Sequence, residues 1–323
     1  MRAGVAAFGL AFCACTETLD AGSTKPHGML PVDERNPLIV LNDGATDNWQ
    51  GEYAVLLANG GGPPLAGIIV NTSPVWGDID TNVTEWRSLV AAARQSGLDG
   101  IPDPVASLGA PLVQPATGRI EDTTPNRSEG ARLILAVAAE LSRPYRPVVV
   151  ATGTRLTDVA DAYLLDPSVA DKIVVVSSLG ALSAMGANMS NPNGEMDAWA
   201  DLIVSKRLRY VQVSAYYDQL TDVPDSQVSE LPDSALGAWM AAKQPKIYTI
   251  AVASDQVGVL AAGFPPFVGA VSRVTAPASP TSNGGPELVA DPQGSAWLVT
   301  ESKGELATAR LWELLDREPA PGN

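Results

Sequence analysis

The sequence predicts an α/β protein with a Rossmann-like core, in which a mostly parallel central sheet is flanked by helices on both faces. Two observations carry this prediction. Short apolar runs typical of fully buried strands alternate along the chain with segments of helical periodicity. In addition, 46% of the 323 residues are apolar, enough to bury a full core in one large domain or two small ones. Alternating strands and helices form parallel sheets that helices cover on both faces.

The predicted elements begin with "PLIVL" (37–41), a buried strand, followed by the helical pattern "EYAVLLANG" (52–60), which glycine closes. "LAGIIV" (65–70) is the second strand. The remaining predicted helices cover residues 83–97, 131–142 and 156–166, and the remaining strands cover 147–152, 172–178, 209–215 and 246–253. No internal repeat interrupts this order, so we expect a single domain over residues 37–316.

The first 15 residues, "MRAGVAAFGLAFCAC", resemble a bacterial export signal. They contain one basic residue, a short apolar stretch and small residues before Cys15, and they are too short to span a bilayer. Cys15 is placed as a lipid acceptor, with Cys13 as the other candidate. A lipoprotein signal is favoured, and a plain cleaved signal stays open. We therefore expect a periplasmic or cell-surface protein, attached to the membrane only through such an anchor.

The two other terminal segments are expected to lie outside the folded domain. Residues 16–36 show no periodicity and are rich in Pro, Gly, Ser and Thr, which predicts a flexible tether. Residues 317–323 are expected to form a disordered tail.

Charge and histidine content exclude several functions. Lys and Arg total 21 against 36 Asp and Glu, a formal charge of −15, which disfavours nucleic acid as a partner. The single histidine, His27, lies in the expected tether, so the domain lacks the imidazole of a Ser-His-Asp or Cys-His triad and of a His-rich zinc site. No Gly-x-Ser-x-Gly, Gly-x-Gly-x-x-Gly or Walker motif is present, so another α/β hydrolase or a dinucleotide-binding protein is a weak alternative.

Acidic residues follow the predicted strands at the places where parallel sheets bind ligands. Asp43 and Asp47 come after the first strand and Asp255 after the last. Such a turn taken alone is typical of a solvated loop or a helix cap. Carboxylates that converge on one sheet edge repel each other unless a cation compensates for them. The positions after the strands therefore favour a metal site.

Six segments carry a resemblance to a known family. "LIVLNDGATDN" (38–48) resembles the strand and Asp-Pro-Gly-x-Asp-Asp loop that open the inosine/uridine-preferring nucleoside hydrolases. No single segment is specific, but their common order is, and together they cover residues 37–265. The other five are similar to later segments of that family: "PLAGIIVNTS", "GIPDPVASLGAPL", "VVVATGTRLTDVADAYLLDP", "KIVVVSSLGALSAMGANMSNPNGEMDAWAD" and "IAVASDQVGVLAA".

The resemblance implies a nucleoside-hydrolase-like fold and a calcium-dependent enzyme. The reaction would cleave the N-glycosidic bond of a ribonucleoside or related glycoside with a calcium-bound water, and Asp47 would be the general base. It also implies a small-molecule nucleoside or sugar as substrate and leaves a homo-oligomer open. By position, Ca²⁺ would be held by Asp43, Asp47, Asn48, Asp255 and the Thr157 carbonyl, and the sugar by Asn188, Glu195 and Asp197.

Three departures from the family pattern bear on activity. Asn48 replaces a ligand aspartate, Asp197 replaces a sugar-binding asparagine, and Ser254 stands where many members carry a histidine. A catalytically weakened nucleoside- or sugar-binding lipoprotein of the same fold is therefore the alternative function. Trp49, Trp76 and Trp199 could stack on a sugar or base, although packing is the favoured role of each.

Overall fold

The computed structural model describes residues 25–73, 76–178, 192–247, 252–253, 255–275 and 290–317. An eight-stranded sheet forms its centre, in the order β3-β2-β1-β4-β5-β6-β10-β9. All neighbouring strands are parallel except β9 and β10, which confirms the predicted fold class. The strands of this sheet are β1 (Leu38–Asn42), β2 (Leu65–Val70), β3 (Pro104–Ala106), β4 (Val148–Thr152), β5 (Ile173–Ser177), β6 (Arg209–Val213), β9 (Val268–Val274) and β10 (Ala296–Ser302).

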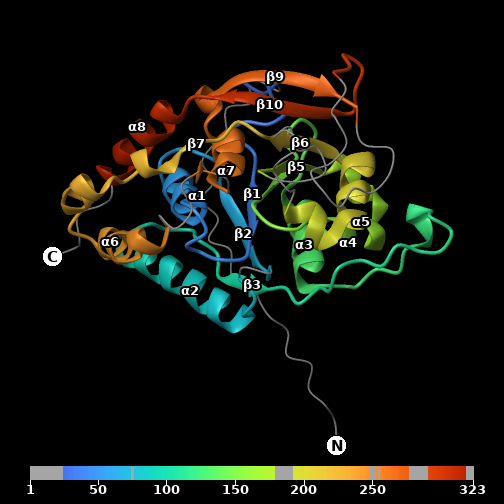
Figure 1. Cartoon of the computed structure of the whole chain (residues 1–323), viewed down its shortest axis with the longest axis horizontal. Helices are drawn as coiled ribbons and strands as arrows, with labels where there is room; N and C mark the ends of the chain where they lie inside the picture. Colours follow the sequence, from blue (N-terminus) through green and yellow to red (C-terminus); the bar gives the residue numbers. More distant parts are fainter. Residues whose placement is uncertain are drawn as a thin grey trace, which may run out of the picture.

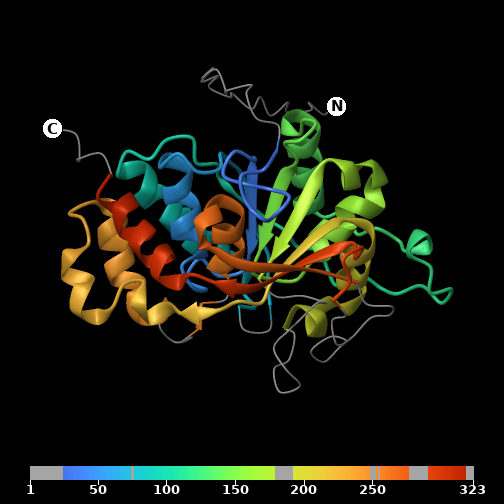
Figure 2. The same ribbon diagram turned by 90° about the horizontal axis from the view of Figure 1, so that it is seen from above.

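Helices cover both faces of the sheet (Figures 1 and 2). One layer contains α1 (Gln50–Asn59), α2 (Ile79–Gln95), α6 (Ala235–Ile247), α7 (Gln256–Gly263) and α8 (Gly304–Leu315). The other contains α3 (Glu129–Leu141), α4 (Thr157–Leu165) and α5 (Pro192–Arg207). Short 3₁₀ helices are η1 (Ile120–Asp122), η2 (Pro167–Asp171), η3 (Gln219–Thr221), η4 (Asp225–Glu230) and η5 (Pro265–Phe267).

Two hydrophobic cores lie on opposite sides of the sheet. Leu38 and Val40 of β1 belong to the first core, and Ile39 and Leu41 belong to the second. Successive side chains of a strand point to opposite faces, so a strand between two helical layers must be apolar at every position. This requirement explains the unbroken apolar runs from which the strands were predicted.

The chain reverses its direction of travel across the sheet between β1 and β4. From β1 it runs outward to β2 and β3, then returns to β4 on the other side of β1 and continues to β5 and β6. The loops that follow β1 and β4 therefore lead to opposite faces of the sheet. Open α/β sheets bind ligands at such a switch point.

The predicted strand over 246–253 was wrong in its first part. Lys246 and Ile247 form the last turn of α6, and the described strand, β8 (Val252–Ala253), pairs with β7 (Tyr217–Asp218) in a separate two-stranded sheet. The strands β9 and β10 were not predicted. β9 lies at the edge of the sheet with most of its residues only half-buried, and the last three residues of β10 are polar, so neither strand carries the unbroken apolar run of a central strand.

Part of the expected tether packs onto the domain. Of its residues, the structure describes 25–36, and among these Leu30 and Val32 are buried in the first core. The Asn36 side chain donates a hydrogen bond to the Pro147 carbonyl, 2.8 Å away. Within the described ranges, no helix combines the length and the apolar character that a bilayer span requires.

Candidate functional site

Three aspartates that are distant in sequence meet at the switch point. Asp43 is the first residue beyond β1, Asp47 lies in the following turn, and Asp255 immediately precedes α7. One carboxylate oxygen from each lies within 4.8 Å of the other two. Asp43 and Asp255 are buried and Asp47 is half-buried. The structure thus brings together all three aspartates that the sequence analysis selected.

Glycine allows Asp255 to reach this position. A Cβ atom on Gly153, the residue after β4, would lie 2.3 Å from the Asp255 Cγ, so any larger residue would displace the start of α7. The first turn of α7 also sits over β5, since a Cβ on Gly258 would lie 3.3 Å from the Val176 carbonyl. The Asn42 amide then donates to the Asp255 Oδ2 at 3.0 Å. Asp255 is therefore held against the ends of β1, β4 and β5.

Local hydrogen bonds shape the acidic loop, residues 43–48. The Asn42 Oδ1 accepts the Asp43 N–H at 2.9 Å, and the Asp43 Oδ1 accepts the Gly44 N–H at 2.7 Å. Asn48 has a positive φ of 58°, a conformation that asparagine tolerates better than most residues, and its amide donates to the Asp47 Oδ1 at 2.9 Å. The loop thus turns Asp43 and Asp47 toward the same space.

The electrostatics of the cluster favour a bound cation. Burial, together with the neighbouring charge of Asp47, raises the pKa of Asp43 to about 7. Burial also raises the pKa of Asp47, against hydrogen bonds from Asn48 and Trp76 that lower it. Both shifts mean that the ionised carboxylates are disfavoured next to each other in a site shielded from water. A divalent cation would remove this penalty.

The spacing of the oxygens also fits one ion. Calcium binds six to eight oxygens at about 2.3–2.6 Å, so oxygens on opposite sides of the ion lie up to about 5 Å apart. The 4.8 Å limit within the cluster falls inside one such shell. The donors are carboxylates with an asparagine beside them, which is the chemistry that hard cations prefer. The described residues therefore fit calcium.

Asn71 is a site residue that the sequence analysis did not select. It follows β2, and its N–H donates to the Asn42 carbonyl at 3.0 Å, beside the acidic loop. Its side chain is buried, and neither amide atom has a hydrogen-bond partner in the described part of the chain. Because buried amides are almost always paired and the described residues offer this one no partner, Asn71 is a candidate for contact with a ligand. The available signal was a polar residue directly after a buried strand.

Two of the three candidate tryptophans are buried in the hydrophobic cores. Trp76 lies against Gly44, where a Cβ would be 2.7 Å from its ring, and the Lys246 Nζ lies 4.2 Å from the ring centroid. Trp49 is fully buried in the first core. Trp199 is buried in the second core and donates its indole N–H to the Thr123 hydroxyl at 2.9 Å. Packing therefore describes Trp49 and Trp199, whereas half-buried Trp76 also contacts the acidic cluster, where its hydrogen bond lowers the pKa of Asp47.

Thr157 and Asp197 lie together on the other helical layer. Thr157 is the first residue of α4, and its hydroxyl donates to the Asp197 Oδ2 at 2.7 Å. Asp197 occupies a kink in α5, with φ of −159° and ψ of 73°. Asn188, Ser254 and the side chain of Glu195 lie outside the described residues.

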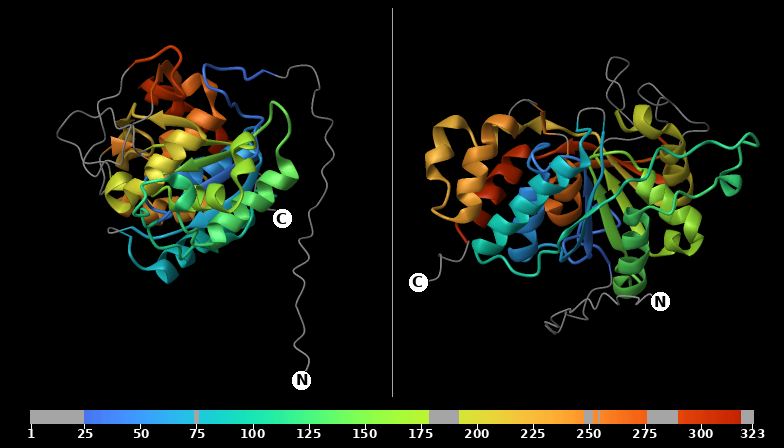
Figure 3. Two further views of the ribbon diagram at one scale, coloured as in Figure 1. Left: turned by 90° about the vertical axis from the view of Figure 1, so that its right-hand side faces the viewer. Right: turned by 90° about the horizontal axis from the view of Figure 1, so that it is seen from below.

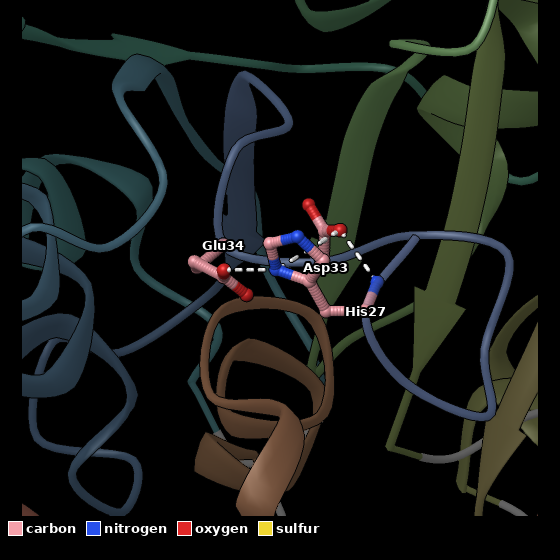
Figure 4. Close-up of side chains that lie close together, drawn as sticks. All are labelled: His27, Asp33 and Glu34. Atoms are coloured by element: carbon pink, nitrogen blue, oxygen red, sulfur yellow. Dashed lines mark hydrogen bonds and ion pairs between the residues drawn. The ribbon is translucent and has the colours of Figure 1, made fainter. Parts of the chain in front are cut away.

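A second group of ligand-type side chains contains His27, Asp33 and Glu34 (Figure 4). The His27 Nδ1 lies 2.9 Å from the Glu34 Oε1 and 4.0 Å from the Asp33 Oδ2. The Arg35 guanidinium already pairs with Asp33, and the Arg146 guanidinium lies 4.0 Å from it. These cations neutralise the carboxylate that a metal would need, so the group is an ion-pair network that fastens residues 25–36 to the domain.

The fold is shared with solved nucleoside hydrolases. No family model matches the sequence, and no curated protein matches it. A plant nucleoside hydrolase aligns with a TM-score of 0.62 and 16% identity over 89% of this chain and 100% of its own. An inosine-guanosine nucleoside hydrolase aligns with a TM-score of 0.62 and 15% identity, over 88% of this chain and 100% of its own. The inosine-uridine preferring nucleoside hydrolase of Bacillus anthracis aligns with a TM-score of 0.62 and 12% identity, over 87% of this chain and 99% of its own.

Proposed function

We propose that this protein is a calcium-dependent hydrolase that cleaves the N-glycosidic bond of a ribonucleoside or a related glycoside. The observation that carries the proposal is the convergence of Asp43, Asp47 and Asp255 at the switch point of a nucleoside-hydrolase-like fold. Neither the fold nor the acidic cluster would suffice alone, because many functions use related sheets and acidic clusters also occur without metals.

The proposed roles follow from burial and position. Asp43, Asp47, Asn48, Asp255 and the Thr157 carbonyl would hold the ion. Calcium, when bound, would orient the sugar hydroxyls and lower the pKa of the attacking water. Of the three clustered aspartates, Asp47 alone is half-buried rather than buried, so it can contact a water that enters from solvent. Asp47 is therefore the proposed general base, a role worth roughly two to four orders of magnitude in rate.

The remaining groups would bind the sugar and stabilise its transition state. Glycoside cleavage passes through a positively charged, oxocarbenium-like transition state, which carboxylates near the anomeric carbon stabilise. Asn71 presents an unpaired amide at the same sheet edge and is proposed to bind the substrate. Asn188, Glu195 and Asp197 remain proposed sugar contacts, with a further role for Asp197 developed below.

A calcium titration and a ribose-release assay test this proposal. The full-length protein is titrated with calcium by calorimetry and then assayed for free ribose from a panel of nucleosides. We expect saturable calcium binding at one site and calcium-dependent release. Asp47→Asn should lower kcat by at least two orders of magnitude. The control, Asp80→Asn, changes an exposed aspartate at the start of α2 and should leave both measurements unchanged.

The outcomes separate the two candidate functions. A protein that binds calcium and nucleosides but releases no ribose is the catalytically weakened binding protein, for which the substitution of Asn48 for an acid is the favouring observation. A protein that binds neither calcium nor nucleosides contradicts both functions. Ribose release that survives Asp47→Asn contradicts the assignment of the base.

A further inference from the structure

Arg155 is the one cation among the buried charged residues that the structure describes. It lies between β4 and α4 and is only 9% exposed. Its Nε has no hydrogen-bond partner among the described residues. Burying a cation is unfavourable unless nearby groups compensate for the lost hydration. The buried charges around it are acidic, so they compensate for the lost hydration of the guanidinium.

Arg155 donates a hydrogen bond to one carbonyl, and its charge acts on two buried carboxylates. Its Nη2 donates to the Gly109 carbonyl at 2.7 Å. Its charge lowers the pKa of Asp158 and of Asp197, against burial, which raises both. Each of these carboxylates in turn holds the segment that contains Gly109. The Asp158 Oδ1 accepts the Ser107 hydroxyl at 2.5 Å.

Asp197 is surrounded by donors. Its Oδ2 accepts the Thr157 hydroxyl at 2.7 Å and the Leu112 N–H at 2.9 Å. Its Oδ1 accepts the Ala200 N–H at 3.0 Å, which caps the second half of the kinked α5. An asparagine could accept only some of these hydrogen bonds. Its NH₂ group would face a backbone N–H, which is a donor and cannot accept a hydrogen bond.

Residues 107–112 are thereby fastened across the edge of the sheet that bears the acidic loop. The segment leaves β3 and is held by side chains at the start of α4, which follows β4. Strands β2 and β1 lie between β3 and β4, and the acidic loop follows β1. Further on, the chain continues to η1 beside α5 (Figure 3), where Glu121 pairs with Arg207.

We infer that Asp197 and Arg155 are positioning residues, which clamp residues 107–112 and Thr157 in place beside the active site. This inference rests on the proposed function, because Thr157 is a proposed calcium ligand. It explains two features of the chain together. A carboxylate at position 197 accepts the Leu112 N–H that an asparagine would leave unpaired, and Arg155 compensates for the charge that the carboxylate adds.

The test compares Asp197→Asn, Arg155→Gln, Arg155→Lys and the double variant Asp197→Asn/Arg155→Gln in the full-length protein. Asp166→Asn is the control, since Asp166 accepts a backbone N–H from Ser168 at the opposite end of α4. Amide hydrogen exchange of Leu112 is measured without metal, and calcium affinity, KM and kcat are measured with it.

We expect Asp197→Asn and Arg155→Gln each to speed Leu112 exchange at least tenfold and to weaken calcium binding about tenfold through Thr157. Arg155→Lys keeps the charge and should recover most of both. The double variant should lose less than the product of the single losses, because each residue compensates for the other's charge. Asp166→Asn should match wild type.

Other results overturn the clamp. If Asp197→Asn raises KM alone and leaves Leu112 exchange unchanged, Asp197 is a sugar contact only. If Arg155→Gln and Arg155→Lys behave alike, the charge of Arg155 has no positioning role, and this pair decides the question even if Asp197→Asn fails to fold. Exchange without metal also tests the clamp when wild type binds no calcium, a result that would contradict the proposed function but not the clamp.

Discussion

Glu52 shows how the surroundings of one residue can set its ionisation. It lies in the first turn of α1, as the helical pattern predicted, but it is fully buried rather than exposed. Neither carboxylate oxygen has a hydrogen-bond partner among the described residues. Burial, reinforced by the charge of Glu85, raises its pKa well above the usual range. The fold therefore favours the neutral form of Glu52 up to a higher pH than the unfolded chain does.

We predict that Glu52→Gln stabilises the protein at neutral pH. A raised pKa in the folded state gives stability that is complete below the unfolded pKa and declines as pH rises. Glutamine is neutral in the folded and the unfolded protein, so the variant does not lose this stability as pH rises. The unfolding free energy of Glu52→Gln should thus exceed that of wild type by an amount that grows by up to about 1.4 kcal/mol per pH unit above pH 5. Urea denaturation at pH 5, 6 and 7 measures it, and parallel pH profiles for both proteins would contradict the prediction.

At the scale of elements, Glu85 joins α2, α6 and the acidic loop. Its carboxylate lies 3.1 Å from the Nζ of Lys243 and 3.1 Å from that of Lys246, and it accepts the Thr46 hydroxyl at 3.0 Å. Lys246 also lies over the ring of Trp76, which packs on Gly44 of the same loop. The acidic loop is therefore braced from outside by two helices.

We predict that Glu85→Gln destabilises the protein by about 1–2 kcal/mol, since the carboxylate is only 8% exposed while its lysines are 33% and 42% exposed. Calcium binding should weaken as well, because Thr46 lies in the acidic loop. Glu313→Gln is the matched control. Glu313 also pairs with two cations, but it is 46% exposed on α8, and its loss should leave stability nearly unchanged. Equal effects of the two variants in urea denaturation would exclude the brace.

At the scale of the whole molecule, the acidic cluster couples folding to calcium and pH. The pKa of Asp43 rises to about 7 in the folded protein from an ordinary value of 3.8. The metal-free protein should therefore lose stability as pH rises from 4 to 7, by at most about 4 kcal/mol from this residue. A cation that binds only the folded state reverses this loss.

We predict that calcium raises Tm more at pH 8 than at pH 5, because at pH 5 protons compete for the same carboxylates. At 100 times its dissociation constant, calcium should add about 2.7 kcal/mol to the free energy of unfolding. Calorimetric scans at both pH values with calcium or a chelator measure this. The same stabilisation at both pH values, or its persistence in Asp255→Asn, would place the ion elsewhere.

Sequence pattern alone predicted the class of fold and the acidic residues of the candidate site. Strands buried on both faces must be apolar at every position, so "LIVL" and "VVVA" identified β1 and β4 without any contact being known. The carboxyl ends of parallel strands share one edge, so Asp43 and Asp47 could be expected there. Asp255 reaches the same edge although the strand before it, β8, lies in the small sheet. The strands β9, at the sheet edge, and β10, beside it, escaped detection because a partly buried strand shares its mixture of polar and apolar residues with loops.

What those residues contact depends on the folded chain. Asp255 immediately precedes α7 and reaches the cluster because Gly153 leaves room for it. Helices distant in sequence raise the pKa of buried Glu52 and place Lys246 over the ring of Trp76. Asp197 accepts donors from three segments, with Arg155 nearby to compensate for its charge. Burial and pairing depend on which segments meet in space, and spacing along the chain does not contain that information.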